Sequence, residues 1–221
     1  MILIPYEIKT GEENMRTDLA LIDKAIKTGQ KEHIFRLYGW KPACLSLGKN
    51  QSDYFLDYGF LRKLGIDAVR RFTGGRALLH ANEVTYSYIC PIDTLKDGEN
   101  VKESYREISQ ILIEGFKNLG ITLDFGRTKH TPEGHKDYCM LVSAESDLCY
   151  NGRKVIGSAQ LRKNGYILQH GSILYDYNIN LLNRIFGTEI NTATITCVKE
   201  INPDITKEDI IESLSKLAKQ A

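Results

Sequence analysis

The stretch Asn151-Gly-Arg-Lys-Val-Ile-Gly-Ser-Ala-Gln160 carries the clearest structural signal in the chain. Asn151-Gly152 predicts a tight hairpin turn, because both central turn residues must accept a positive φ. The run from the turn to Arg162 is predicted to be a strand. A second Asn-Gly pair, Asn164-Gly165, predicts a return into another strand, residues 166–174. The stretch therefore predicts two hairpins in succession.

Small side chains occupy the middle of the first of these strands, at Gly157-Ser158-Ala159. Such residues pack poorly by themselves and favour a place where a ligand or another backbone comes close. Because strand side chains alternate, Lys154 is predicted to share a face with Ser158 and not with Gly157. Cys139 lies fifteen residues before this lysine, so the two form a candidate nucleophile pair. The alternative is a hairpin with a solvated lysine.

The composition is that of an ordinary globular protein. The 221 residues include 29 basic and 28 acidic side chains, a net charge of +1, which gives no sign of general nucleic-acid binding. No apolar run is long enough to span a membrane, and the first residues do not resemble a signal peptide. We find no repeat and no linker. A single domain over residues 1–221, without a separate C-terminal accessory domain, is therefore expected.

Five cysteines are scattered through the chain without a Cys-x-x-Cys pair: Cys44, Cys90, Cys139, Cys149 and Cys197. Their odd number and irregular spacing argue against a disulfide framework and a zinc site, so no metal is expected. A reducing, cytoplasmic location is the corresponding expectation. Most of these thiols are expected to be buried. Cys149, two residues before the Asn-Gly turn, is the alternative to Cys139 as a nucleophile.

Helices and short strands alternate irregularly along the chain. Apolar residues at helical spacing predict the helices, with Asn14 as the cap of the first one. The predicted elements are helices 15–26, 57–64, 101–119, 179–186 and 206–219, and strands 1–6, 34–38, 44–47, 67–71, 77–80, 84–90, 121–125, 154–162 and 166–174. The polar residues 126–136 are predicted to form a surface loop. This mixture predicts an α+β fold (mixed-sheet α/β) and not an alternating βαβ fold.

A glycine pair lies between two predicted strands, in Arg70-Arg-Phe-Thr-Gly-Gly-Arg-Ala77. Paired glycines let a backbone approach a ligand closely and present N–H groups to it. The flanking arginines suit a phosphate or a carboxylate. The loop lacks the Gly-Lys-Ser/Thr ending of a P-loop, and a plain turn with solvated arginines is the alternative. His80 follows this loop in the sequence, and both a structural and a catalytic role stay open for it.

Four segments, taken in order, resemble the superfamily of lipoate–protein ligases, octanoyltransferases and biotin ligases. They are Asn14-Met15 with Leu19, Ile22 and Asp23; Phe35–Trp40 through Ser46–Gln51; Arg70–His80 with Glu83–Ser87; and Asn151–Gln160 with Gln169–Ile173. The last two segments are long and specific, and together the four span most of the chain. The resemblance implies a single catalytic domain of the biotin and lipoate ligase type.

The chain most resembles the octanoyltransferases found in many Gram-positive bacteria. In that form a cysteine precedes the Gly-Arg/Lys-Lys motif, and Cys139 has the corresponding spacing to Lys154. The resemblance implies that an octanoyl group passes from octanoyl-acyl carrier protein to Cys139. A lysine of a lipoyl domain, in glycine-cleavage H protein or a dehydrogenase E2, would then accept it during protein lipoylation. No cofactor, nucleic acid or membrane is expected to take part.

The resemblance also implies roles for the site residues. Cys139 is the expected nucleophile, and burial is expected to lower the pKa of Lys154 while its cation stabilises the thiolate. Backbone N–H groups near Gly157-Ser158-Ala159 are expected to stabilise the oxyanion. The residues expected to bind the substrate are Arg71, Thr73, Gly74, Gly75, Arg76, Ala77, His80, Gly157, Ser158, Ala159, His170, Gly171, Ser172 and Ile173.

Other functions stay open at the level of sequence. An ATP-dependent lipoate–protein ligase would use Lys154 to hold a lipoyl-adenylate, with ATP and Mg²⁺ required and Cys139 incidental. A non-catalytic protein that only binds lipoyl domains or acyl carriers would need neither side chain. The match to the biotin ligases is weaker, because their glycine-rich loop differs.

Overall fold

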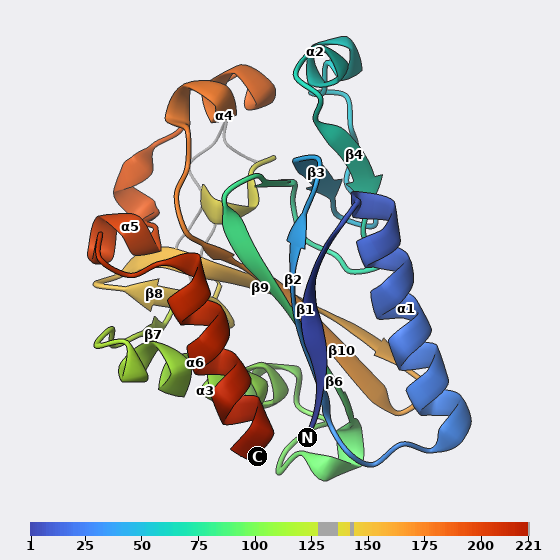
Figure 1. Ribbon diagram of the computed structural model, residues 1–221. Coiled ribbons are helices and arrows are strands. Elements are labelled where there is room, and N and C mark those ends of the chain that lie inside the picture. The colour runs from blue at the N-terminus through green and yellow to red at the C-terminus, as the bar shows by residue number, and fades with distance from the viewer. Residues whose placement is uncertain (128–136, 142–143, 221) are drawn as a thin grey trace.

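The computed structural model describes residues 1–127, 137–141 and 144–220 (Figure 1). Its strands are β1 (Ile2–Lys9), β2 (Ile34–Trp40), β3 (Cys44–Leu47), β4 (Asp67–Arg70), β5 (Leu78–His80), β6 (Glu83–Pro91), β7 (Asp124–Phe125), β8 (Leu148–Tyr150), β9 (Arg153–Lys163) and β10 (Tyr166–Leu174). Its helices are α1 (Gly11–Thr28), α2 (Tyr58–Lys63), α3 (Val101–Asn118), α4 (Ile179–Phe186), α5 (Val198–Ile201) and α6 (Lys207–Gln220), with short 3₁₀ turns η1 (Ile92–Thr94), η2 (Cys139–Leu141) and η3 (Thr192–Thr194). Over these ranges, no helix has the length and apolar character needed to cross a membrane.

The larger of two sheets contains seven strands in the order β1-β2-β6-β10-β9-β8-β7, and the smaller has the order β4-β3-β5. In the larger sheet β1 and β2 run parallel, whereas the other neighbours are antiparallel. This mixed sheet confirms the predicted fold class. Both predicted hairpins are present, because Asn151 and Asn164 adopt positive φ values of 49° and 47°.

Helices cover both faces of the larger sheet (Figure 1). On one face α1 packs Ile22 against Leu168 of β10. On the other face lie α3 and α6, whose Phe116 and Leu214 belong to one buried cluster. Gly115 lets these two helices approach, because a Cβ there would overlap the Leu214 side chain. Removing these apolar side chains from water is the main favourable contribution to folding.

The smaller sheet carries the glycine-pair loop, residues 71–77, between β4 and β5. Its apolar core joins Leu47 of β3 to Leu61 of α2. Gly75 has a φ of 94°, and its carbonyl oxygen occupies the place where a side chain of residue 48 would lie. Residue 48 is a glycine, so two loops touch through their backbones.

The first helix begins earlier than the sequence predicted. Thr10 is its N-cap and forms a capping box with Glu13. Asn14, the predicted cap, is instead completely buried and donates from its side-chain amide to the Gly39 carbonyl at 3.0 Å. The prediction failed because both residues have cap-forming side chains, and only the tertiary contact assigns Asn14 to the interior.

The alternation of side chains along β9 is interrupted at its start. The register between β8 and β9 shifts between Leu148 and Cys149, and the Lys154 side chain lies on the same face as Gly157. The expectation that Lys154 shares a face with Ser158 is therefore wrong, because a bulge adds one residue to the strand. Most of the predicted surface loop 126–136 lies outside the described residues, which omit 128–136.

Candidate active site

Cys139 is held against the glycine-pair loop by backbone hydrogen bonds. It is the first residue of η2, and its N–H donates to the Ala77 carbonyl at 2.8 Å. The Ala77 N–H in turn donates to the Asp137 carbonyl at 2.9 Å. The Cys139 thiol is partly exposed, whereas the other four cysteines are buried. The structure therefore presents one accessible thiol, at the end of the loop.

Lys154, the second residue of β9, points toward Cys139. Its Nζ lies 4.0 Å from Cys139 Sγ and donates to the Cys139 carbonyl at 3.1 Å. The lysine is only 2 % exposed. Gly157 provides the space for it, because a Cβ at that position would lie 2.9 Å from Lys154 Cε. The small residue thus makes room for the lysine side chain.

Asp147 is the counter-ion of Lys154, and sequence reasoning missed it. The Lys154 Nζ lies 2.9 Å from Asp147 Oδ2, and both side chains are almost completely buried. The same carboxylate accepts the Ala144 N–H at 2.8 Å and the Ser158 N–H at 3.3 Å. A buried ammonium requires a paired charge. The acidic residues between Cys139 and Lys154 were therefore the sequence signal that could have identified this counter-ion.

The pKa of Lys154 departs from its expected direction. Burial lowers this pKa, but the Cys139 thiolate and the Asp147 carboxylate outweigh burial and raise the pKa above its ordinary value. The expectation of a lowered pKa is wrong, because it considered desolvation without the carboxylate partner. Lys154 is therefore an ammonium at neutral pH while the thiolate is present.

The Ser158 N–H is already occupied by Asp147. It is therefore not the free oxyanion donor that the sequence suggested. The Lys154 ammonium lies 4.0 Å from Cys139 Sγ, close to where the oxygen of an acyl group bound to that sulfur would carry negative charge. The geometry favours charge stabilisation by this side chain over stabilisation by the strand backbone.

A narrow cavity of about 50 Å³ opens beside Cys139. Its floor crosses the larger sheet, because Gly157 pairs with Ser172, Ser172 with Thr85, and Thr85 with Tyr38. The cavity is lined by Met15, Tyr38, Trp40, Ser46, Arg71, Gly74, Gly75, Leu78, His80, Thr85, Cys139, Gly157, Ser158, Ala159, His170, Gly171 and Ser172. The cavity crosses four neighbouring strands. This slot therefore extends over three strand spacings, roughly 14 Å at about 4.8 Å each.

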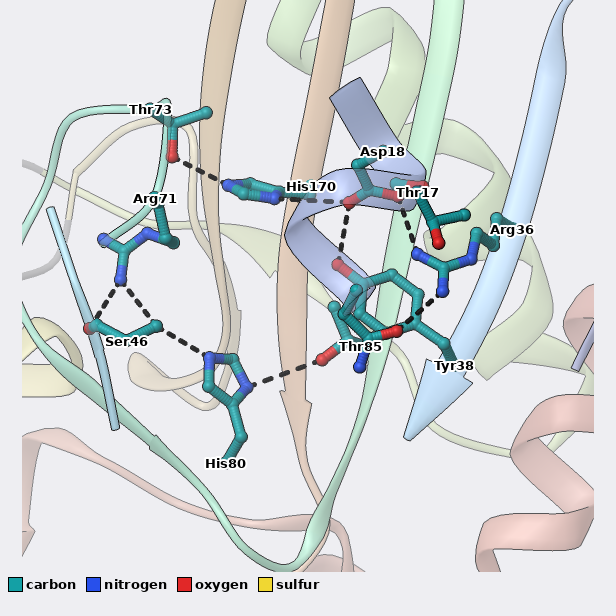
Figure 2. A network of polar contacts seen from close by, with 12 residues as sticks. Thr17, Asp18, Arg36, Tyr38, Ser46, Arg71, Thr73, His80, Thr85 and His170 are labelled. Atoms are coloured by element: carbon teal, nitrogen blue, oxygen red, sulfur yellow. Dashed lines mark hydrogen bonds and ion pairs between the residues drawn. The ribbon is translucent and has the colours of Figure 1, made fainter. Parts of the chain in front are cut away.

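A buried polar network beneath the cavity fixes the glycine-pair loop to the sheet and to α1 (Figure 2). Thr73 Oγ1 lies 2.7 Å from His170 Nε2, and His170 Nδ1 lies 3.7 Å from an Asp18 carboxylate oxygen. Asp18 also accepts from Arg36 at 2.8 Å and from the Tyr38 hydroxyl at 2.9 Å. Asp18 and Arg36 are fully buried, so their charges depend on each other.

A second set of contacts organises the cavity wall. Arg71 donates to Ser46 Oγ at 2.7 Å, and this hydroxyl lies 2.8 Å from His80 Nε2. The His80 ring stacks on Trp40 with ring centroids 4.0 Å apart. Burial lowers the pKa of His80, which Glu83 only partly offsets. His80 is therefore a neutral, packed member of the wall at neutral pH.

The structure brings most of the predicted site residues to this cavity. Those that line it are Arg71, Gly74, Gly75, His80, Cys139, Gly157, Ser158, Ala159, His170, Gly171 and Ser172. Thr73 acts through its contact with His170, and the Arg76 carbonyl accepts from Arg71 at 3.0 Å. Ala77 is buried behind Cys139, and Ile173 belongs to the core under α3.

Met15, Tyr38, Trp40, Ser46, Leu78 and Thr85 also line the cavity and were not predicted as site residues. They come from α1, β2, β3, β5 and β6, so no short motif unites them. Cys149, the alternative nucleophile, is 2 % exposed and is not among the lining residues. The described residues contain no group of three or more metal-ligating side chains suited to an ion.

The mixed sheet, the glycine-pair loop and the lysine strand together surround a narrow cavity with one accessible thiol. The chain belongs to the Lipoyl protein ligase A/B catalytic domain family, which matches residues 10–218. This membership confirms the resemblance drawn from the four sequence segments.

Two relatives are named octanoyltransferase LipM. The protein from Clostridioides difficile (strain 630) is 40 % identical over 182 residues, which cover 81 % of this chain and 67 % of that protein. The protein from Staphylococcus aureus is 40 % identical over 190 residues, covering 81 % and 68 %. The chain thus spans about two thirds of the length of these relatives. Their similarity bears out the expected class of enzyme, an acyltransferase.

Solved structures show the same fold. A lipoate-protein ligase A bound with ATP has a TM-score of 0.76 at 19 % identity, covering 97 % of this chain and 82 % of that one. P. falciparum LipL1 in complex with lipoate has a TM-score of 0.72 at 21 % identity, covering 97 % and 60 %. These likenesses show the fold of the chain.

Proposed function

We propose that this protein transfers an octanoyl group from octanoyl-acyl carrier protein to a lysine of a lipoyl domain through a thioester on Cys139. The observation that carries the proposal is the 4.0 Å separation of Lys154 Nζ and the Sγ of Cys139, which lines the cavity. A thiolate beside a buried ammonium is an activated nucleophile. The relatives named octanoyltransferase support the choice of acyl group.

In the first half-reaction the Cys139 thiolate attacks the carbonyl carbon of the donor thioester. The carbon–sulfur bond to the donor breaks, and the departing thiolate takes a proton from the Lys154 ammonium. Acylation removes the negative charge of the thiolate, which is one cause of the raised pKa of Lys154. Lys154 is thus a neutral amine when the second half-reaction begins, and that half-reaction needs a base.

In the second half-reaction the acceptor amine attacks the Cys139 thioester. The bond between the acyl carbon and Cys139 Sγ breaks as the amide forms. Lys154 takes the proton that the amine releases, which restores the thiolate–ammonium pair. The thioester already carries the needed reactivity, so the proposal requires neither ATP nor Mg²⁺.

The length of the cavity matches an eight-carbon chain. An extended chain advances about 1.3 Å per bond, given carbon–carbon bonds of about 1.5 Å, so seven bonds span roughly 9 Å of a slot of roughly 14 Å. Met15, Leu78 and Trp40 offer apolar contacts along its wall. Burial is worth about 0.8 kcal/mol per methylene, so a chain that fills the slot binds more tightly than a shorter one.

Intact-mass spectrometry after exposure to octanoyl-acyl carrier protein tests the proposal. One octanoyl adduct is expected on the wild-type protein and none on Cys139→Ala, whereas Cys149→Ala should behave as wild type. The adduct should disappear when an apo lipoyl domain is added, without ATP. Transfer that requires ATP and free lipoate would favour the ligase, and lipoyl-domain binding without any adduct would favour a non-catalytic protein.

A further inference from the structure

The lobe formed by residues 41–80, termed the basic lobe below, concentrates positive charge. It contains seven lysines and arginines and three aspartates, a net charge of +4 in a chain whose total is +1. Lys41, Lys49, Arg62 and Lys63 are exposed. As far as the structure describes the chain, no lysine or arginine of this lobe has a carboxylate within 4.0 Å. Its positive charge is therefore available to a partner.

The basic lobe also carries exposed apolar side chains. Seven large hydrophobic residues are exposed in the described parts of the chain, and four of them lie here: Tyr54, Tyr58, Leu64 and Phe72. Tyr54 is 79 % exposed. Surfaces that combine aromatic residues with arginine are typical of protein interfaces, whereas scattered single hydrophobic residues need no explanation. The concentration of four exposed apolar residues in one lobe favours contact with another protein.

The basic lobe is joined directly to the segment that carries the nucleophile. The Tyr54 hydroxyl donates to Asp137 Oδ2 at 3.2 Å, and Gln51 Nε2 donates to the Asp137 carbonyl at 3.0 Å. Asp137 lies two residues before Cys139. Phe72 directly follows Arg71, which lines the cavity. A protein bound to the lobe would therefore lie beside the cavity that Cys139 and Arg71 line.

We propose that the basic lobe is the docking surface of the octanoyl donor, an acidic carrier protein that bears the thioester on a phosphodiester-linked arm. This inference rests on the proposed transferase function. An acidic protein and an anionic arm both complement the net charge of +4. Charge complementarity therefore assigns the lobe to the donor, and the lipoyl domain is the competing occupant in the test.

Charge reversal on α2 tests the assignment. Arg62 and Lys63 lie in the last turn of α2, are exposed, and are remote from the described catalytic contacts. The variant R62E/K63E is compared with K216E/K219E, which makes the same change in net charge on α6, at the opposite end of the molecule (Figure 1). Acylation of Cys139 is measured with octanoyl-acyl carrier protein and with octanoyl-N-acetylcysteamine, a small neutral thioester.

R62E/K63E should lower kcat/KM for the carrier-bound donor about tenfold or more and weaken its dependence on salt. The same variant should acylate at the wild-type rate with the small thioester, and K216E/K219E should match wild type with both donors. Equal losses in the two variants, a loss with the small thioester, or a raised KM for the lipoyl domain alone would overturn the assignment. Failure of the wild-type protein to acquire an adduct from either donor would instead reject the transferase function itself.

Discussion

The carboxylate of Asp147 lies 2.9 Å from the Lys154 ammonium, and the two residues are 3 % and 2 % exposed. The same ammonium reaches the Cys139 carbonyl and sulfur. Asp147 is thus in a position to keep Lys154 charged and aimed at the thiol. This makes the site a row of three groups, a sulfur, an amine and a carboxylate, and not the pair that the sequence suggested.

Replacing Asp147 by Asn should lower the pKa of Lys154, because the carboxylate is one of the groups that raise it. Acylation that depends on the ammonium should then fall off at a lower pH in the variant. Wild-type acylation by a small thioester should persist up to about pH 10, below the ordinary lysine pKa of about 10.4, because the pKa of Lys154 is raised. The pH profile of the acylation rate measures this difference.

Two variants frame the Asp147 experiment. Asp147→Glu keeps the carboxylate and should restore much of the alkaline activity. Glu145→Gln removes a nearby acid that is partly exposed and pairs with Lys102, so it should leave the profile unchanged. An Asn variant with the wild-type profile would show that the ion pair has no part in setting the charge of Lys154.

Gly157→Ala should reduce acylation strongly while leaving the fold intact. The added Cβ would lie 2.9 Å from Lys154 Cε and 3.1 Å from Nζ, so the amine must move away from Cys139. Gly74→Ala provides a comparison in the same cavity, because its Cβ would meet no atom within 4 Å. Acylation rates and thermal midpoints of both variants check the prediction. A Gly157→Ala variant that acylates at the wild-type rate would contradict the placement of Lys154.

Arg36→Met should destabilise the protein by about 3–5 kcal/mol, because it leaves the Asp18 carboxylate buried without its cation. The pair has an N–O distance of 2.8 Å and side chains that are 0 % and 3 % exposed. Lys163→Met breaks an exposed pair with Asp23 and should cost at most about 1 kcal/mol. Urea unfolding of the two variants measures both values, and similar small losses would show that the buried pair is replaceable.

His80 should make stability depend on pH on the acidic side of neutrality. Burial lowers its folded-state pKa, so below the ordinary histidine pKa of about 6.5 the unfolded chain binds a proton that the folded protein does not. Stability should therefore fall as the pH drops from 7 through 6.5 toward the lowered pKa. Burial also lowers the pKa of His33, so both histidines contribute to the dependence of stability on pH. His80→Gln should therefore remove only part of that dependence. Urea unfolding midpoints measured from about pH 5 to about pH 7, a range that brackets the ordinary histidine pKa, test this prediction. An unchanged dependence of the midpoint on pH in His80→Gln would exclude a contribution from His80.

Much of the fold follows from local sequence. The turns at Asn151 and Asn164 form where predicted, because few residues accept a positive φ and Asn-Gly does so readily. The helix α3 was predicted from the spacing of its apolar residues. A helix that packs on a sheet buries one stripe of such residues, so the spacing is visible in the sequence. The glycine-pair loop and the lysine strand identified the family because each is a continuous run of residues.

The chemistry of the site depends on contacts that no continuous run contains. The β9 bulge turned Lys154 toward Gly157, a choice made by pairing with β8. Asp147 could not be assigned to Lys154 from spacing alone, because which acid meets a buried amine is settled by packing. The sequence by itself determined the turns, the helix periods and the loop, since these depend on sterics between near neighbours. Only the tertiary structure decided which charges share a dry interior, because electrostatic partners are selected by distance in space and not along the chain.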